Sequence, residues 1–340
     1  MGAATSVQTY LGLWLMARTG SISDAAMRNC SAIALSMMMM PKPLFSALAL
    51  FAAVLANPGS AKQTPVAETA PPAPPLRPAL WKVSDADTTI YLFGTIHLLP
   101  QGMEWLNGPL ADAVGSADEL VTEIPEEGDG TVQTSLMARA VLPKGKSLRG
   151  LMTKRERARF EATLTGFKLP VASFDSYKPW YAAVVLATIP LLRDGFAVGS
   201  GVENTLAERV KERGRPRIGL ETLDYQLALF DGLPQRTQLR YLTEVIEALP
   251  TLRKTVDEIV SEWGEGDAAK LAELMNAAED DPAMVTILLT NRNRTWASWI
   301  KTRLAAPGTS FVAVGAGHLG GPGSLQDQLS MLGISALRVQ

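Results

Sequence analysis

The sequence contains very little cysteine or histidine. Cys30 is the single cysteine among 340 residues, and the chain has two histidines. We expect Cys30 to be absent from the processed protein, because it precedes the expected export signal. A domain without cysteine forms no disulfide and carries no thiolate chemistry, so its stability depends on its core. With 47% hydrophobic residues, the chain can build a large core.

The chain also lacks a surplus of either charge. It has 32 Lys and Arg against 34 Asp and Glu, which gives a net charge of -2. A nucleic-acid-binding surface needs a concentration of basic residues. We therefore expect no nucleic acid among the partners of this protein.

The apolar run near the N-terminus is too short to span a membrane. It covers 13 residues, Leu44 to Ala56, whereas a spanning helix needs roughly 20. Lys42 precedes the run, and small residues lead from Gly59 to Ala61, which is the order of a secretory signal. We predict cleavage near Ala61 and a periplasmic or secreted protein that meets the membrane only during export. The alternative is an uncleaved N-terminal anchor.

Four consecutive methionines, Met37 to Met40, precede this signal, and residues 1–36 match no part of a signal. We expect translation to start within these methionines. Residues 62–78 are rich in proline and alanine, which favours an extended spacer without a core. The expected organisation is a signal through residue 61, a linker over residues 62–78 and a domain over residues 79–340.

Hydrophobic periodicity and turn residues predict strands at both ends of the domain and helices between them. The expected strands cover residues 80–83, 88–93, 119–124, 217–221, 310–314 and 335–339. The expected helices cover residues 109–116, 131–140, 153–165, 179–192, 201–213, 235–263, 268–277, 282–304 and 324–332, with an interruption at residues 291–294. The predicted fold class is α/β, of the mixed α+β kind, with a central mixed sheet flanked by helices and a helical middle section.

The two histidines occupy matching motifs. His97 and His318 each end a Gly-x-x-His sequence that follows an apolar strand. In α/β proteins, ligands bind at the edge where parallel strands end. Neutral imidazole binds metal ions and titrates near neutral pH, so the pair indicates a metal site or acid–base catalysis. The alternative is two unrelated histidines that cap or pack.

Carboxylates are needed to complete a metal site, because a catalytic divalent ion takes about three protein ligands. Glu123 lies at the end of the third expected strand, Glu203 opens a helix and Glu221 ends the fourth expected strand. All three can face the same edge, and Glu203 also suits a helix start. Arg292 is a candidate for holding a substrate carboxylate or stabilising an oxyanion. The alternative role, an exposed arginine on a helix, suits Arg294 better.

Six motifs occur in the order of one family: Leu80–Val83, Tyr91–His97, Gly201–Glu203, Gly219–Thr222 followed by Gln226 and Leu227, Asn291–Asn293, and Gly315–His318. On these motifs, over roughly residues 78–340, the sequence resembles the TraB/GumN family, which is related to the Tiki-type membrane metalloproteases. That family is similar in fold to the erythromycin-esterase and ChaN-like group (EreA/ChaN-like). Nothing in the sequence matches the C-terminal membrane anchor of the Tiki proteins.

The resemblance implies an exported metal-dependent hydrolase, in particular a peptidase that acts on a peptide or another small substrate. It implies a divalent ion, Mn²⁺, Co²⁺ or Zn²⁺, held by His97 and His318. On this basis Glu123 is a ligand or general base, Glu203 and Glu221 are further candidate ligands, and Arg292 stabilises developing negative charge. A bound divalent ion lowers the pKa of its water and polarises a carbonyl.

The competing interpretation is a ligand-binding protein without catalysis. ChaN-like relatives bind haem, and other members of the family are linked to peptide pheromones or to polysaccharide gene clusters. Five tyrosines are available as haem ligands: Tyr91, Tyr177, Tyr181, Tyr225 and Tyr241. The sequence does not identify the substrate or the oligomeric state.

Overall fold

The computed structural model describes residues 75–97, 99–100, 102–125, 129–194, 196, 201–276 and 282–340. The expected translation start, export signal, cleavage site and most of the linker lie outside these residues. Among the residues that are described, no helix is both long and apolar enough to cross a membrane.

A six-stranded mixed sheet lies at the centre of the domain, in the order β4-β3-β5-β2-β1-β6. The strands are β1 (Leu80–Ser84), β2 (Thr88–Thr95), β3 (Glu119–Thr122), β4 (Arg217–Gly219), β5 (Gly308–Gly315) and β6 (Leu337–Arg338). Neighbours among β2, β5, β3 and β4 run parallel, whereas β1 is antiparallel to both β2 and β6. This mixed α/β fold, with strands from both ends of the domain, confirms the prediction from the sequence.

The parallel pairing of β2 with β5 brings the two Gly-x-x-His motifs together. Thr95 lies opposite Gly315 in the register, so the two strands end side by side. The motifs then approach closely, because a Cβ on Gly94 would lie 3.0 Å from the Cα of Ala316. His97 and His318 therefore leave the sheet at the same edge, although more than two hundred residues separate them in the chain.

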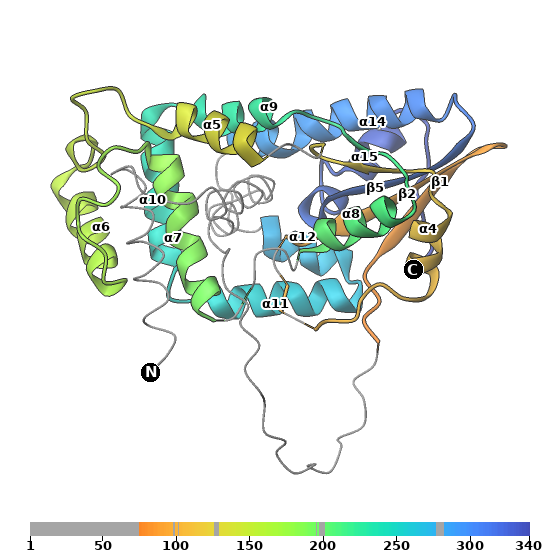
Figure 1. Cartoon of the computed structure of the whole chain (residues 1–340), viewed down its shortest axis with the longest axis horizontal. Coiled ribbons are helices and arrows are strands. Elements are labelled where there is room, and N and C mark those ends of the chain that lie inside the picture. Colours follow the sequence, from red (N-terminus) through yellow and green to blue (C-terminus); the bar gives the residue numbers. More distant parts are fainter. Residues whose placement is uncertain are drawn as a thin grey trace, which may run out of the picture.

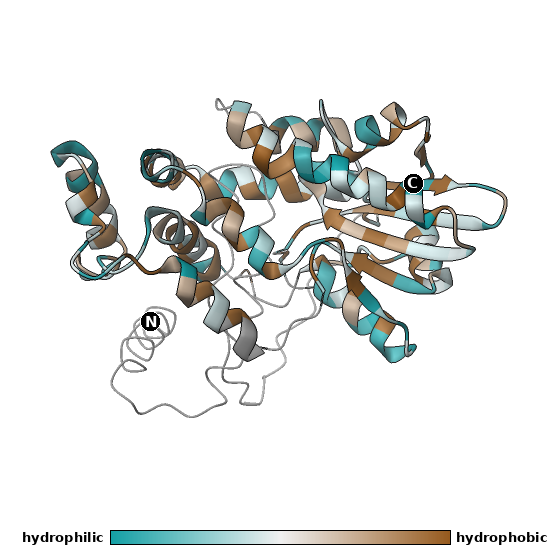
Figure 2. Cartoon of the chain, turned by 90° about the horizontal axis from the view of Figure 1, so that it is seen from above, coloured by the Kyte–Doolittle hydropathy of each residue, from teal (hydrophilic) through white to brown (hydrophobic). Residues whose placement is uncertain are grey.

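Helices cover both faces of the sheet (Figure 1). On one face α14 (Asn291–Arg303) and α15 (Leu325–Met331) pack on Ile90, Leu92 and Val312. On the other face α4 (Gly108–Ser116), α8 (Val202–Glu212) and α11 (Leu252–Glu265) pack around Phe93 and Phe311. Successive strand residues point to opposite faces, so strands that are apolar throughout can fill both cores. Figure 2 shows these hydrophobic strands between the helical layers.

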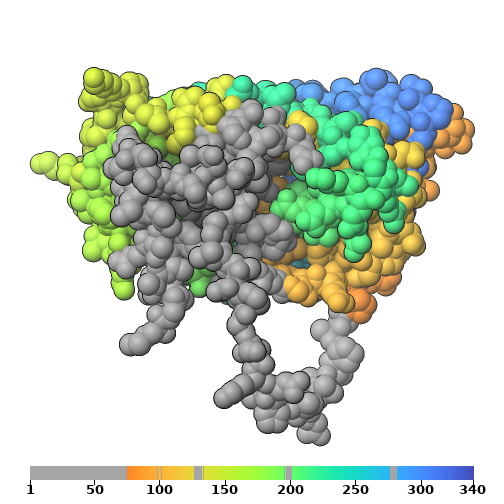
Figure 3. Space-filling view, in the orientation of Figure 1, coloured from red at the N-terminus to blue at the C-terminus, as the bar shows by residue number. Residues whose placement is uncertain are grey.

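The middle of the chain forms a helical section that extends beyond the sheet (Figures 1 and 3). It contains α5 (Asp129–Ala140), the short 3-10 helix η1 (Arg149–Leu151), α6 (Lys154–Gly166), α7 (Pro179–Arg193), α9 (Leu223–Asp231) and α10 (Gln235–Ala248). Most residues of α7 are buried. A helix that is apolar on all sides is expected to be enclosed by others. α12 (Ala268–Asn276) and α13 (Pro282–Val285) lead back toward the sheet.

The structure differs from the expectation in two long helices and in one further helix that was not expected. The helix expected over residues 235–263 is two helices, α10 and α11, because Pro250 lies between them and proline supplies no N–H to a helix. The expected interruption at residues 291–294 is wrong: the irregular turn is the π-helix η2 (Thr286–Thr290), and residues 291–294 begin α14. The helix α9 was not predicted, although Thr222 caps it by accepting the N–H of Tyr225.

Candidate functional site

His97 lies just beyond β2 and is held by Glu203. Its Nδ1 lies 2.6 Å from Glu203 Oε1, and both side chains are buried. The start of α8 creates this pair, because the N–H of Val202 donates to the carbonyl of Ile96 at 3.1 Å. Gly201 permits that approach, since a Cβ there would lie 2.2 Å from the carbonyl oxygen of His97. The Gly201–Glu203 motif thus has a structural explanation.

The two partners shift each other's pKa. Burial lowers the pKa of His97, but Glu203 more than offsets this and raises the pKa above its ordinary value. Burial raises the pKa of Glu203, whereas His97, with a smaller contribution from Thr95, brings it below its ordinary value. A carboxylate on Nδ1 orients an imidazole and stabilises the charge formed when Nε2 takes a proton. The pair therefore has the geometry of an imidazole whose orientation is fixed by a carboxylate.

Glu123 and Glu221 lie side by side beyond β3 and β4. The N–H of Glu221 donates to the carbonyl of Glu123 at 2.7 Å, which continues the strand pairing past the strand ends. Glu123 Oε1 accepts the N–H of Gly315 at 2.7 Å, so the end of β5 fixes this carboxylate. Gln226 Nε2 donates to Glu221 Oε2 at 2.8 Å and to Glu123 Oε2 at 3.3 Å. Gln226 on α9 thus joins the two carboxylates, and the end of β5 also holds that of Glu123.

Arg292, near the start of α14, joins the two carboxylates. Its Nη2 donates to Glu123 Oε2 and, at 2.8 Å, to Glu221 Oε2, while its Nε donates to Glu221 Oε1 at 2.9 Å. Its Nη1 donates to the carbonyl of Leu288 at 3.1 Å and lies 3.1 Å from His318 Nε2. A guanidinium has five N–H donors, and each of them has an acceptor here. The Arg292 side chain is 1% exposed.

His318 is fully buried and hydrogen-bonded at both ring nitrogens. Its Nδ1 lies 2.7 Å from Asn293 Oδ1. Asn293 Nδ2 donates to the carbonyl of Gly323 at 2.8 Å, which sets the orientation of the amide. The amide oxygen of Asn293 can only accept, so Nδ1 of His318 carries the proton. The guanidinium of Arg292 can only donate, so Nε2 accepts from it. His318 is therefore a neutral imidazole in this network.

The charges in the cluster act on one another. Burial raises the pKa of Glu123 to about 7, with Arg292 opposing the shift and Glu221 adding to it. Burial lowers the pKa of Arg292, but Glu123 and Glu221 raise it above its ordinary value. Arg292 thus stays charged, whereas Glu123 can exchange a proton near neutral pH.

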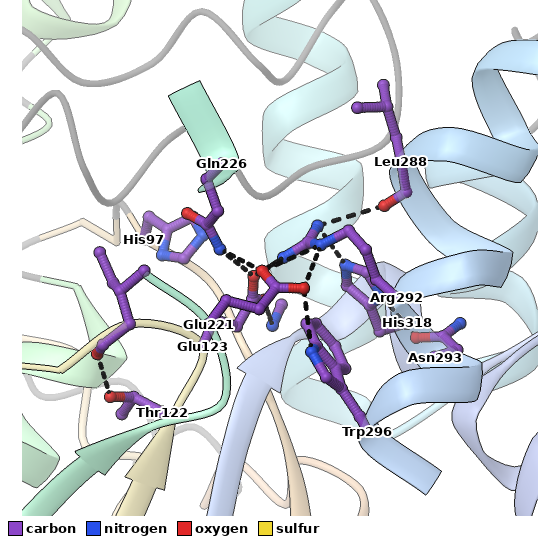
Figure 4. Close-up of polar contacts among 12 residues, drawn as sticks. His97, Thr122, Glu123, Glu221, Gln226, Leu288, Arg292, Asn293, Trp296 and His318 are labelled. Carbon is purple, nitrogen blue, oxygen red and sulfur yellow. Dashed lines mark hydrogen bonds and ion pairs between the residues drawn. The ribbon is translucent and has the colours of Figure 1, made fainter. Parts of the chain in front are cut away.

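The predicted site residues converge at one edge of the sheet in two adjacent groups. Figure 4 shows His97 together with Glu123, Glu221, Arg292 and His318. One group is the pair of His97 and Glu203; the other consists of Glu123, Glu221 and His318 around Arg292. The groups interact, because the charge of Glu123 raises the pKa of His97. Their roles as ligand, base or oxyanion stabiliser stay predictions. To stabilise an oxyanion, Arg292 would have to give up one of its present hydrogen bonds, since every N–H already donates to an acceptor in the site.

The donor atoms do not fit a divalent metal ion in this arrangement. Glu123, Glu221 and His318 direct their donors at Arg292, which is itself a cation. Across the described ranges no group of three or more His, Cys, Asp or Glu is placed to hold a metal ion. Because Nδ1 of His318 carries the proton, only Nε2 has a lone pair that could bind a metal ion. That lone pair already accepts a hydrogen bond from Arg292 Nη1.

Three side chains of the site were given no role from the sequence. Gln226 bridges the two carboxylates, and Asn293 orients His318. Trp296 donates from Nε1 to Glu221 Oε1 at 3.0 Å, and its ring lies against both Arg292 and His318. The four-residue spacing of Arg292 and Trp296 places both on one helix face, which is a signal that the sequence does contain.

The tyrosines considered as haem ligands are mostly part of the packed interior. Tyr177, Tyr181 and Tyr241 belong to a chain of aromatic contacts among the helices of the middle section. Tyr91 packs near Phe311, on the sheet. Tyr225 is the exposed member of the group, at 44%, and lies on α9.

The fold and the site define an α/β domain that gathers a buried histidine–carboxylate pair and an arginine–carboxylate cluster at the exits of its parallel strands. The model of the TraB/PrgY/gumN family matches residues 79–337 of the chain, and the chain belongs to this family. It is 25% identical over 239 residues to the uncharacterized protein YbaP of Escherichia coli (strain K12). The aligned region covers 70% of this chain and 87% of YbaP. The YbaP of Shigella flexneri matches with the same identity and coverage. No solved structure matches the chain.

Proposed function

We propose that this protein is a hydrolase in which His97 activates water. The observation that carries the proposal is the buried contact of 2.6 Å between His97 Nδ1 and Glu203 Oε1 at the exit of a parallel strand. Glu203 holds the ring and stabilises the imidazolium, and Nε2 is the nitrogen that takes the proton of the water. General base catalysis of this kind typically contributes about 100-fold to 10,000-fold in rate.

The second group at the strand exits supports the same proposal. Glu123, with its pKa raised to about 7, can release or take up a proton near neutral pH and interacts with His97 through its charge. Arg292 holds Glu123 and Glu221 against the strand ends. As the substrate class we propose a peptide or another small molecule with a hydrolysable carbonyl bond, and as the location the periplasm or the exterior of the cell.

The divalent ion implied by the resemblance, Mn²⁺, Co²⁺ or Zn²⁺, stays a prediction. In the present arrangement the proposed proton transfer depends on His97 and Glu203 rather than on the donors that contact Arg292. The competing proposal is a protein that sequesters a ligand such as haem, and a visible absorbance band of haem in the purified protein would favour it.

The test is a peptide-cleavage screen of the exported protein, run in parallel with a chelator and with added Mn²⁺, Co²⁺ or Zn²⁺. We expect Glu203→Gln and His97→Gln to lower the rate by about 100-fold or more. Glu208→Gln, an exposed position on the same helix, is the matched control and should keep the wild-type rate. Folded His97→Gln protein that cleaves at the wild-type rate would contradict the proposal.

The location has a separate test. N-terminal sequencing of protein recovered from the periplasm or the medium should give a sequence that begins just after residue 61. A mature protein that still carries residues 44–56 would instead support the uncleaved anchor.

A further inference from the structure

A positively charged group occupies the centre of the candidate metal donors. Three of the five residues predicted to bind a metal, Glu123, Glu221 and His318, all contact the guanidinium of Arg292. The other two, His97 and Glu203, pair with each other. Figure 4 shows the guanidinium between the two carboxylates and the ring of His318.

The contacts use the same lone pairs that a metal ion would need. Arg292 Nη2 takes Oε2 of both glutamates, and Arg292 Nη1 takes Nε2 of His318. Because the proton of His318 is on Nδ1, Nε2 offers the ring's single available lone pair. A divalent ion and the Arg292 guanidinium therefore compete for one set of donor atoms.

The surroundings hold the guanidinium in place. Its Nη1 also donates to the carbonyl of Leu288, one turn earlier in the chain, and the Trp296 ring lies 4.7 Å from its central carbon. All five N–H groups are satisfied inside a buried site, and arginine does not deprotonate in proteins. Moving it aside would leave a buried cation without partners, which is strongly unfavourable.

We infer that Arg292 is the resident cation of this site and takes the place of a divalent metal ion. Its positive charge offsets part of the negative charge of the two carboxylates, its hydrogen bonds hold both of them against the strand ends, and His318 accepts from it as a neutral ring. While Arg292 is in place, Glu123, Glu221 and His318 bind no divalent metal ion. This inference is independent of whether the protein hydrolyses a substrate.

The experiment measures metal binding rather than activity. The exported protein is stripped with a chelator and titrated with Co²⁺, with calorimetry and the visible spectrum of the bound ion as readouts. We expect the wild type to show no site that depends on Glu123 or His318. Arg292→Ala frees three donors and should gain a Co²⁺ site that the wild type lacks, seen as a heat of binding and as a new visible band of the bound ion.

Two further variants make the result specific. Arg294→Ala changes an exposed arginine on the same helix and should bind Co²⁺ as the wild type does. The double variant Arg292→Ala, His318→Ala should lose the gained affinity, because one of the three donors is missing.

Two results would overturn the inference. The first is a wild-type protein that binds one equivalent of Co²⁺ through a site abolished by Glu123→Gln or by His318→Ala. The second is folded Arg292→Ala protein with no gain in affinity. Should Arg292→Ala fail to fold, the titrations of the wild type, Glu123→Gln and His318→Ala still decide between the two cations. None of these readouts depends on hydrolysis, so failure of the proposed function would be seen separately.

Discussion

At the scale of single residues, the site depends on small groups that let polar side chains meet. Gly94 allows one histidine motif to pass the other, and Gly201 allows the start of α8 to contact the backbone of His97. The N–H of Gly315 then fixes Glu123. Gly94 and Gly201 act by leaving room for a neighbouring backbone, and Gly315 acts through its backbone N–H. The positions of His97 and Glu123 therefore depend on residues that have no side-chain functional group.

Gly201→Ala is therefore expected to disturb both stability and the histidine pair. The new Cβ would lie 2.2 Å from the carbonyl oxygen of His97, so the backbone must move and carry Glu203 with it. Overpacking of this kind typically costs about 1 to 3 kcal/mol of unfolding free energy. Denaturant unfolding and the cleavage rate measure the two effects.

Gly166→Ala is the matched control for that substitution. Gly166 ends α6, has no atom within 4 Å of the position of an added Cβ, and its φ is not in the left-handed range. Alanine there should leave stability unchanged or raise it slightly, because it restricts the unfolded chain. If both variants unfold at the wild-type midpoint, the close approach at Gly201 does not constrain the site.

At the scale of elements, the sequence predicted the parts of the site with a strong local signal. The hairpin of β1 and β2 and the strand before His318 were clear from apolar runs and from the turn at Asp85. The edge shared by the two histidines also followed from these strands. The sequence did not reveal that Arg292 lies between the carboxylates, because that contact joins α14 to β3 across 169 residues.

The two elements whose boundaries were predicted wrongly differ from the expectation for different physical reasons. η2 is a π-helix in which the backbone shifts by one residue, and no side-chain pattern marks such a shift. It supplies the carbonyl of Leu288 that Arg292 contacts. The break between α10 and α11 had a visible signal in Pro250, but the apolar periodicity continues on both sides of it and suggested one helix.

The short helix η1 is attached to α6 and to the following loop through Arg149. Its Nε and Nη2 bind both oxygens of Asp175, at 2.8 and 2.6 Å, and its Nη1 binds Glu161 Oε1 at 2.8 Å. The hydrogen bond to Arg149 is the main reason that the pKa of Asp175 lies below its ordinary value, and the pKa of Glu161 is lowered in the same way. Ion pairs of Arg149 thus connect η1 to α6 and to the loop that follows α6.

This network should make stability fall in acid. A carboxyl pKa that is lower in the folded than in the unfolded state stabilises the fold above the unfolded pKa, about 4 for Asp. That stabilisation is lost as the pH falls from about 4 through the lower folded pKa of Asp175. We expect Asp175→Asn to cost about 1 kcal/mol at pH 7, a modest value because the pair is partly exposed, and much less below pH 3.

The measurement is denaturant unfolding of both proteins between pH 2.5 and pH 7. Asp224→Asn serves as the control, because its contact with Arg139 is 3.4 Å long and its side chain is 65% exposed. That substitution should change stability little at any pH. A wild-type advantage over Asp175→Asn that stays constant down to pH 2.5 would mean that the ion pair does not contribute.

At the scale of the whole molecule, the two ends of the domain are tied together. β6 near the C-terminus pairs with β1, and Gln340 Nε2 donates to the carbonyl of Pro78 at 2.9 Å. The N–H of Arg77 donates to the carbonyl of Gly264 at 2.7 Å, and Asn107 Nδ2 donates to the carbonyl of Leu76 at 3.1 Å. The last residues of the expected linker therefore contact the folded domain.

Deleting residues 63–75 from the exported protein should hardly change the melting temperature, because a proline-rich spacer buries no apolar surface. Extending the deletion to residues 63–78 removes the three hydrogen bonds of Leu76, Arg77 and Pro78, each worth about 1 kcal/mol. In a domain of this size about 1 kcal/mol corresponds to a shift of about 2 to 4 °C, so the longer deletion should melt several degrees lower. Equal melting temperatures for the two deletions would place the start of the domain at Ala79, whereas a large drop with the shorter one would mean that the spacer itself docks on the domain.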